Sequence, residues 1–241
     1  VLLRRIGRHG NGPDDARRAA DLLHGAGLGN LGIDLMNALP GQTRTGFRYD
    51  LESALSLGVE HLSVYAITPE PGTRYAERAP KDPDDDAAQD MWEDAGRLLA
   101  ERGLPRYEIS NYARPGFESR PNSNVWKGQT YLGLGPSAVS FDGIDRWMEE
   151  PDLARWLAGA PPERDVVSHE ARAREMFVMG LRTTRGWGRE EFRTASGADW
   201  RDFPERIACV RDGLLVEEAD RILPTEKGLS FWNALAEAFL I

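Results

Sequence analysis

Helical and strand-like segments alternate through the first half of the chain, and this alternation limits the fold more than any other feature of the sequence. Apolar residues recur at helical spacing in three stretches, each of which ends at a glycine. Short apolar runs between and after them predict strands at 30–36, 61–67 and 107–111. Strands that alternate with helices predict a parallel sheet whose strands are joined by right-handed crossovers.

Two observations lead us to expect the C-terminal part of a larger α/β protein. Only three such strands are predicted, which is too few to close a barrel, and the strand at 30–36 would have one unpaired edge. The sequence also opens at Val1 with residues 1–8, which have the pattern of a helix but no preceding N-terminal cap.

The second half of the sequence has a different character. Residues 112–150 are rich in glycine and loop-like, whereas helical stretches predominate from Ser168 onward. A small hairpin is predicted at 214–223, and a single final helix should follow it. Helices followed by a two-stranded wing are typical of a winged-helix module. We therefore expect two domains, residues 1–150 and residues 151–241.

The composition excludes several classes of protein. The net charge is −9 and the pI is near 5.1, whereas a protein that binds nucleic acid needs basic residues to neutralise phosphates. No apolar run approaches the roughly 18–20 residues that span a bilayer, and no signal peptide opens the sequence. Cys209 is the single cysteine, so this chain alone can form neither a disulfide nor a multi-cysteine metal site. We expect a cytoplasmic protein without nucleic-acid partners or an integral membrane segment.

Asp34 is the most prominent candidate for a functional side chain. Side chains alternate along a strand, so Asp34 should point away from its apolar neighbours Ile33 and Leu35. If those two pack under helices, Asp34 faces the opposite side of the sheet, the interior of a barrel. A carboxylate there is either a ligand-binding group or an acceptor for backbone hydrogen bonds. Spacing alone leaves both alternatives open.

Other candidate motifs are weaker. The turn at 68–73 places Glu70 between prolines, and it either lines a pocket or reflects turn formation alone. The glycine-rich run at 131–138 matches neither the dinucleotide-binding nor the P-loop spacing. The four histidines are scattered and none forms a pair at helical metal-binding spacing, so no zinc site is predicted.

Five sequence blocks, taken together and in order, carry a family resemblance. They are IDLM at 33–36, LPGQT at 39–43, EPGT at 70–73, YEISNYARPG at 107–116 and YLGLGPSA at 131–138. In these blocks the sequence resembles the radical S-adenosylmethionine family of oxygen-independent coproporphyrinogen III oxidases, and within it the heme chaperone branch. The resemblance extends over nearly the whole chain, including its C-terminal part.

The resemblance implies the fold and the cofactors. The expected fold is α/β, the C-terminal part of a partial (β/α)6 radical S-adenosylmethionine barrel followed by a small helical winged-helix-like domain. Members of the family bind S-adenosylmethionine and a [4Fe–4S] cluster held by a CxxxCxxC motif. That motif is absent from this sequence, so the resemblance implies that this chain alone is inactive.

The resemblance also implies site residues. Arg8 and Asp34 match family positions that contact S-adenosylmethionine, and their guanidinium and carboxylate suit the carboxylate and the hydrogen-bond donors of that molecule. Thr68 and Val139 match further contact positions, where the contact is through backbone or van der Waals surface, or where the residue serves packing alone. No catalytic residue and no metal ligand is assigned within the chain.

One segment departs from the heme chaperone pattern. The branch carries a His-Asn-x-x-Tyr-Trp signature for heme, and the matching stretch here is PNSNVW at 121–126. Pro121 cannot ligate iron, and Val125 lacks the phenol. Ser119 stands where relatives often have cysteine. Heme is therefore the least supported of the three implied cofactors.

Three functions remain open at this point. The first is a heme-chaperone-like protein of porphyrin and heme metabolism, with heme or a porphyrin as its small-molecule partner and a heme-acceptor protein as its macromolecular partner. The second is a coproporphyrinogen III oxidase that decarboxylates propionate side chains by radical chemistry. The third is a non-catalytic remnant or interaction protein that has kept only the fold.

Overall fold

The computed structural model describes residues 12–68, 71, 73, 75–77 and 85–240. The chain divides into two compact units, Val1–Glu118 and Ser119–Ile241, which are treated separately below. The helix expected at 1–8 lies outside the described residues. The domain boundary expected between residues 150 and 151 falls inside the second unit and stays a prediction.

The first unit contains three described helices, α2 (Pro13–Gly25), α3 (Arg44–Leu55) and α4 (Asp85–Glu101). Thr43 caps α3, because its side chain accepts a hydrogen bond from the backbone nitrogen of Gly46 at 3.1 Å. Pro13 occupies the first position of α2, where its missing N–H costs nothing. The helices lie where the apolar periodicity predicts them.

The sheet of the first unit has the strand order β1-β2-β4-β3, formed by β1 (Gly32–Asn37), β2 (His61–Ala66), β3 (Arg106–Glu108) and β4 (Asn111–Ala113). The parallel pairing of β1 with β2 confirms one prediction. The prediction of a single third strand at 107–111 is wrong, because this segment folds into the hairpin β3–β4 and β4 runs antiparallel to β2. Glu108 turns the chain there, since its Oε1 accepts a hydrogen bond from the Ser110 nitrogen at 2.8 Å.

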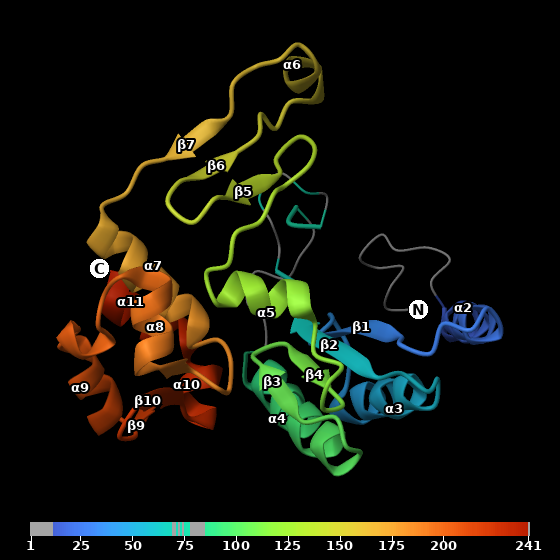
Figure 1. Ribbon diagram of the computed structural model, residues 1–241. Coiled ribbons are helices and arrows are strands. Elements are labelled where there is room, and N and C mark those ends of the chain that lie inside the picture. The colour runs from blue at the N-terminus through green and yellow to red at the C-terminus, as the bar shows by residue number, and fades with distance from the viewer. Residues whose placement is uncertain (1–11, 69–70, 72, 74, 78–84, 241) are drawn as a thin grey trace. The chain divides into compact units, whose positions relative to one another are not determined.

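Helices α3 and α4 cover one face of this sheet (Figure 1). The core between them is apolar, and its fully buried members include Phe47 and Leu51 of α3 and Leu99 of α4. From the sheet, Leu62 and Val64 of β2 are buried in the same core. The intervening residues of β1 and β2 therefore face the other side of the sheet.

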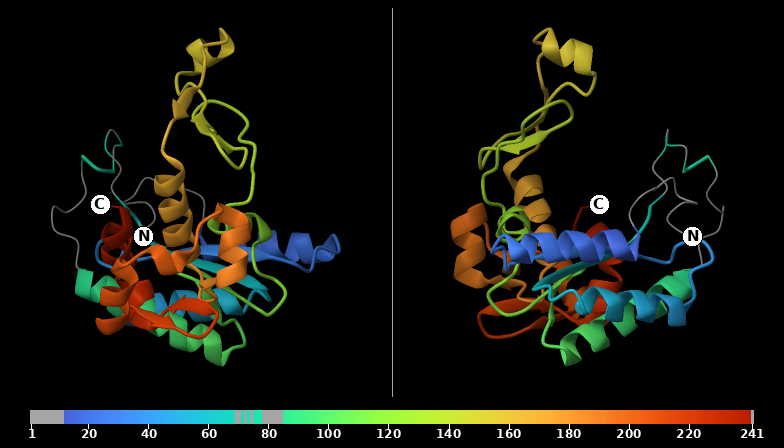
Figure 2. Two further views of the ribbon diagram at one scale, coloured as in Figure 1. Left: turned by 60° about the vertical axis from the view of Figure 1, so that its left-hand side comes forward. Right: turned by 90° about the vertical axis from the view of Figure 1, so that its right-hand side faces the viewer.

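The second unit begins with α5 (Arg120–Trp126) and a small antiparallel sheet of β5 (Val139–Phe141), β6 (Arg146–Met148) and β7 (Glu163–Asp165), with α6 (Leu153–Leu157) between β6 and β7. This sheet lies at the end of helix α7, into which β7 leads (Figure 2). Arg146 of β6 pairs with Glu175 of α7, so a salt bridge ties the sheet to that helix.

The remainder of the second unit is the helical domain with a three-stranded sheet of order β8-β10-β9. Its elements are α7 (His169–Gly180), β8 (Trp187–Gly188), α8 (Arg189–Ser196), the 3₁₀ helix η1 (Trp200–Asp202), α9 (Glu205–Arg211), β9 (Leu215–Glu217), β10 (Arg221–Pro224), α10 (Glu226–Ser230) and α11 (Trp232–Leu240). The expected hairpin is present as β9–β10. The expectation of one final helix is wrong, because Phe231 separates α10 from α11.

Aromatic rings form the centre of this helical domain. Phe177 of α7 is fully buried, and its ring meets those of Phe192, Phe203 and Phe239 edge-on, with centroids 5.0–5.5 Å apart. The indole nitrogen of Trp187 donates to the Phe177 carbonyl oxygen at 2.9 Å, so the buried indole is satisfied. Among the described residues, no helix is both long enough and apolar enough to cross a membrane.

Candidate functional site

Asp34 lies on the face of the sheet opposite α3 and α4, as the alternation predicts. It is exposed, while its neighbours Ile33 and Leu35 pack against the apolar core. In the parallel pair β1–β2 it lies directly across from Ser63, and Ser63 in turn lies across from Asn111 of β4. Side chains at paired positions point to the same face, so these three residues form a polar row across three strands.

A second polar contact lies on the same face. His61 begins β2, and its Nε2 lies 2.8 Å from the hydroxyl oxygen of Tyr107 of β3. The two rings are tilted, with centroids 5.7 Å apart. Between β2 and β3 runs β4, where Ala113 lies across from His61. The small alanine side chain leaves room for the histidine and tyrosine rings to meet above it.

The charge state of His61 follows from its surroundings. Burial lowers the pKa of its imidazole, because a half-buried ring loses the water that would solvate the charged form. The carboxylates of Asp34 and Glu108 oppose this and raise the pKa, but their effect is smaller. The net shift is downward, so His61 is neutral at pH 7 and offers one donor and one acceptor nitrogen.

Three polar groups on this open face have no hydrogen-bond or ion-pair partner among the described residues. They are the carboxylate of Asp34, the hydroxyl of Ser63 and the Nδ1 of His61. This face therefore offers a carboxylate acceptor on β1 and, on the neighbouring β2, a hydroxyl directly across from it and an imidazole nitrogen two residues earlier. Such a set suits a small ligand with hydroxyl or ammonium groups.

The other sequence-predicted site residues are more dispersed. Thr68 is exposed just after the C-terminal end of β2 and belongs to the same unit as Asp34. Val139 begins β5 in the second unit and is 37% exposed. Arg8 lies outside the described residues. Four positions were predicted to contact S-adenosylmethionine. Among the described residues, two of them, Asp34 and Thr68, lie in the same unit of the structure.

The segment that departs from the heme signature forms helix α5. Ser119 is its N-cap, and the Ser119 hydroxyl accepts from the Asn122 nitrogen at 3.4 Å. Pro121 lies in the first turn, where the helix tolerates it. Val125 lines a small cavity of about 70 Å³. Pro121 and Val125 thus supply neither an imidazole nor a phenol to iron.

Cluster ligation cannot be assigned to the described residues. No group of three or more His, Cys, Asp or Glu side chains within them is placed to hold a metal ion. Cys209 lies in α9, buried, and burial raises the pKa of its thiol, which disfavours the thiolate that iron requires. No reaction step through a cluster is therefore derived from this chain.

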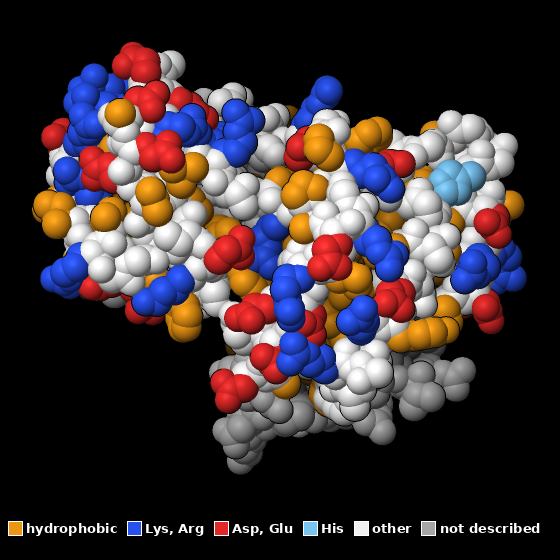
Figure 3. All heavy atoms as spheres, turned by 90° about the horizontal axis from the view of Figure 1, so that it is seen from below, with side chains coloured by type: hydrophobic (Ala, Val, Ile, Leu, Met, Phe, Trp, Pro, Cys, Tyr) orange, Lys and Arg blue, Asp and Glu red, His pale blue; other side chains and the backbone are white. Residues whose placement is uncertain are grey.

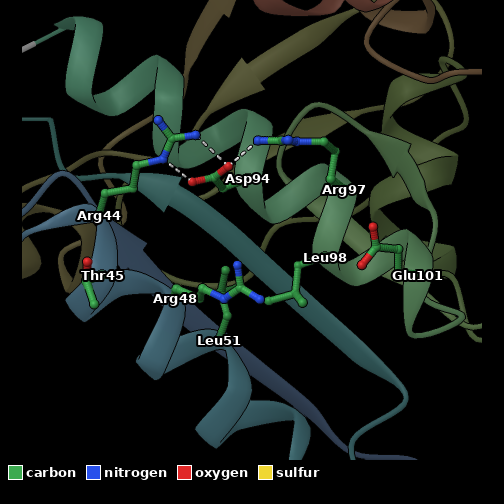
Figure 4. Close-up of a pocket in the computed structure, with 8 residues that line it drawn as sticks. All are labelled: Arg44, Thr45, Arg48, Leu51, Asp94, Arg97, Leu98 and Glu101. Carbon is green, nitrogen blue, oxygen red and sulfur yellow. Dashed lines mark hydrogen bonds and ion pairs between the residues drawn. The ribbon is translucent and has the colours of Figure 1, made fainter.

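A groove of about 440 Å³ between α3 and α4 lies on the other side of the sheet from Asp34. Arg44 and Arg97 both point at Asp94 there (Figure 4). Acidic and basic side chains are interspersed over this side of the molecule (Figure 3). The carboxylate of Asp94 already pairs with both guanidiniums. The groove is therefore lined by ion pairs that link α3 to α4, and these two arginines do not form an anion-binding site.

His61 and Tyr107 are the residues of this face that sequence reasoning missed. The strand at 61–67 was predicted, and its alternation places His61, Ser63 and Tyr65 on one face. This alternation indicates the face that His61 occupies, whereas the spacing of the four histidines gives no sign of its partner. The contact with Tyr107, 46 residues away, leaves no local pattern.

Comparison with known proteins gives results that agree with one another. Residues 167–231 match the HemN C-terminal domain family. The heme chaperone HemW of Escherichia coli K12 is 37% identical over 99% of this chain, and that of Bacillus subtilis 168 is 30% identical over 99%. The solved structure of Escherichia coli coproporphyrinogen III oxidase (HemN), a radical SAM enzyme, matches 99% of this chain with a TM-score of 0.80 and 20% identity.

Residues 167–231 belong to the HemN C-terminal domain family, and the chain as a whole is similar to the heme chaperones HemW. The structural match confirms the expected fold class, part of a radical S-adenosylmethionine barrel followed by a small helical winged-helix-like domain. The chain spans 65% of the length of the Escherichia coli HemW, 66% of the Bacillus subtilis HemW and 61% of HemN, in each case less than two thirds. The family resemblance expected from the five sequence blocks is confirmed.

Proposed function

We propose that the protein is a heme-chaperone-like radical S-adenosylmethionine protein of porphyrin and heme metabolism. The observation that carries this proposal is the similarity to heme chaperones of several bacteria over nearly the whole chain, at 30–37% identity. The proposed partners are heme or a related porphyrin and a heme-acceptor protein. The proposed location is the cytoplasm, in keeping with a chain that contains one cysteine and no disulfide.

The open face of β1 and β2 is the proposed wall of the S-adenosylmethionine site. The ligand carries an ammonium group and ribose hydroxyls, all of which are donors, and Asp34 is an exposed acceptor without a partner among the described residues. Arg8, outside the described residues, would hold the ligand carboxylate. Thr68 and Val139 would add backbone or van der Waals contacts. When bound, S-adenosylmethionine would be the precursor of a 5′-deoxyadenosyl radical.

The [4Fe–4S] cluster belongs to the proposal only for the full-length gene product. This chain has one cysteine, so the three thiolates of a CxxxCxxC motif cannot come from it. The chain's proposed part in the chemistry is to bind and orient S-adenosylmethionine. We expect the 241 residues alone to be inactive.

A coproporphyrinogen III oxidase is the second candidate, favoured by the fold match to HemN. It would bind coproporphyrinogen III and remove carboxylate groups from propionate side chains. The departure at Pro121 weakens the case for heme ligation by α5 and so gives this candidate some weight. A non-catalytic interaction protein is the third candidate, and it predicts that no S-adenosylmethionine is bound.

One experiment separates the three candidates. The full-length gene product is reconstituted with iron and sulfide and supplied with S-adenosylmethionine and with dithionite as the electron donor, and heme binding, coproporphyrinogen III consumption and 5′-deoxyadenosine release are measured. Heme binding without coproporphyrinogen consumption supports the chaperone, and consumption supports the oxidase. Absence of heme binding, of consumption and of 5′-deoxyadenosine supports the interaction protein and contradicts our proposal.

A further inference from the structure

The ring of His61 is held in one orientation by a neighbour. Its Nε2 lies 2.8 Å from the Tyr107 hydroxyl, and this contact leaves Nδ1 as the ring atom without a partner among the described residues. Because the ring is half-buried and neutral, a tyrosine hydroxyl that donates to Nε2 leaves the proton on Nδ1. If the hydroxyl accepts from Nε2 instead, Nδ1 is an acceptor, so in either tautomer Nδ1 is one hydrogen-bonding atom, held in place by the Tyr107 contact.

The space beside Nδ1 is free because the residue across from His61 is a glycine. Gly32 of β1 pairs with His61 in register. A Cβ at position 32 would lie 3.5 Å from His61 Nδ1, and the three atoms nearest to it all belong to His61. An alanine at position 32 would therefore be in van der Waals contact with this nitrogen and would leave less room beside it.

Asp34 lies two residues further along the same strand and face. The rise of a β-strand places it about 6.6 Å from Gly32. Asp34 accepts only, Nδ1 of His61 donates or accepts according to the tautomer, and the Ser63 hydroxyl across from Asp34 can do either. A ribose hydroxyl both donates and accepts, so a ribose diol can satisfy this combination with one hydroxyl toward Asp34 and one toward His61.

We propose that His61 is a ligand-contacting residue of the site around Asp34, where its Nδ1 binds a ribose hydroxyl of an adenosyl ligand, and that Tyr107 positions its ring. The inference rests on the proposed S-adenosylmethionine site and adds two residues to it. The simplest alternative is that His61 and Tyr107 only pack the sheet. In that case neither residue affects ligand affinity beyond its effect on stability.

The probe is S-adenosylhomocysteine, which keeps the ribose and needs no iron for binding. Calorimetric titration of the full-length gene product compares wild type with His61→Phe, which keeps a ring and removes both nitrogens. We expect the Kd to rise about five- to tenfold, as for one lost hydrogen bond. Gly32→Ala should raise the Kd similarly by filling the space beside Nδ1, whereas Gly29→Ala, where a Cβ meets nothing within 4 Å, should not.

The positioning role of Tyr107 is tested by a double-mutant cycle. Tyr107→Phe should raise the Kd in the wild-type background and have no further effect on the Kd in the His61→Phe background. A residue that only stabilises the sheet would show equal effects in both backgrounds, and that result would overturn the role of Tyr107. Melting temperatures of all variants identify any that fail to fold.

The results separate this inference from the proposed function. If wild type does not bind S-adenosylhomocysteine, the proposed site fails and the inference fails with it. If wild type binds and Asp34→Ala weakens binding, but His61→Phe and Gly32→Ala bind as wild type does, only the inference is overturned. Weakened binding by both His61→Phe and Gly32→Ala, with Gly29→Ala unchanged, supports it.

Discussion

His61 of β2 and Tyr107 of β3 meet across an intervening strand, with the histidine Nε2 2.8 Å from the tyrosine hydroxyl oxygen. The small side chain of Ala113 on β4 permits this contact. The imidazole lies half-buried on the same face as Asp34, and burial lowers its pKa, so it is neutral at pH 7. A pH dependence of stability follows from it.

Stability should decrease on mild acidification in a way that depends on His61. The pKa of His61 is lowered in the folded protein. As the pH falls below about 6.5, the ordinary pKa of histidine, the unfolded chain therefore binds a proton before the folded chain does. The free energy of unfolding should therefore fall between pH 7 and pH 5, and His61→Gln should flatten this decrease. Urea titrations at several pH values measure it. His24→Gln, at an exposed histidine, is the control, and equal slopes for His61→Gln and wild type would contradict the account.

The aromatic core of the second unit should be sensitive to truncation. Phe177 is fully buried and meets three other phenylalanine rings, so Phe177→Ala should cost about 3–5 kcal/mol of unfolding free energy. Denaturant titration of this variant is compared with Phe231→Ala. Phe231 is 56% exposed, and its loss should cost roughly 0.5 kcal/mol or less. Similar losses for the two variants would show that the core is assigned to the wrong residues.

Asp199 should stabilise the helical domain except in strong acid. Arg189 and Arg193 donate to its carboxylate at 2.7 and 2.6 Å, and it caps η1. These donors lower the pKa of Asp199 to about 2, so its stabilising effect is present above about pH 4 and is lost as the pH falls toward 2. Asp199→Asn should cost roughly 1 kcal/mol at pH 7 and almost nothing at pH 2. Melting curves at both pH values test this, with Asp220→Asn at an exposed position as the control. A cost independent of pH would contradict it.

A histidine at position 121 should strengthen heme binding. Pro121 lies in the first turn of α5, where histidine can replace it without loss of a helical hydrogen bond. An added imidazole ligand should raise the affinity of the full-length gene product for heme at least about tenfold. Spectroscopic heme titration compares Pro121→His with Arg120→His, which places the imidazole one residue earlier. If wild type binds heme as tightly as Pro121→His, residue 121 has no part in heme binding.

Much of the fold could be predicted from local pattern. Apolar periodicity predicts α3 and α4, and the helical pattern that starts at Ser168 predicts α7, which Ser168 caps. Both signals lie within a few residues of the element that they specify. The hairpin β3–β4 could not be found in this way. Its turn depends on the side chain of Glu108, and the local signal is weak, because Ser110 is the one turn-favouring residue between the two strands.

One part of the candidate site could be predicted from local pattern, and another part could not. Alternation along β1 predicts which face Asp34 occupies, because side-chain direction is a property of the strand alone. The contact of His61 with Tyr107 joins segments 46 residues apart on strands that are not neighbours. It depends on the antiparallel return of β4, which the predicted parallel order did not contain.

The central claim is that Asp34 is part of an S-adenosylmethionine site, and titration of S-adenosylmethionine into the reconstituted full-length gene product tests it most directly. Loss of a charge-assisted hydrogen bond in Asp34→Ala should weaken binding by roughly 1–3 kcal/mol, about 5- to 150-fold in Kd. Asp21→Ala, at another exposed carboxylate of the first unit, should bind as wild type does. An Asp34→Ala variant with unchanged affinity would contradict the account and leave Asp34 a surface carboxylate.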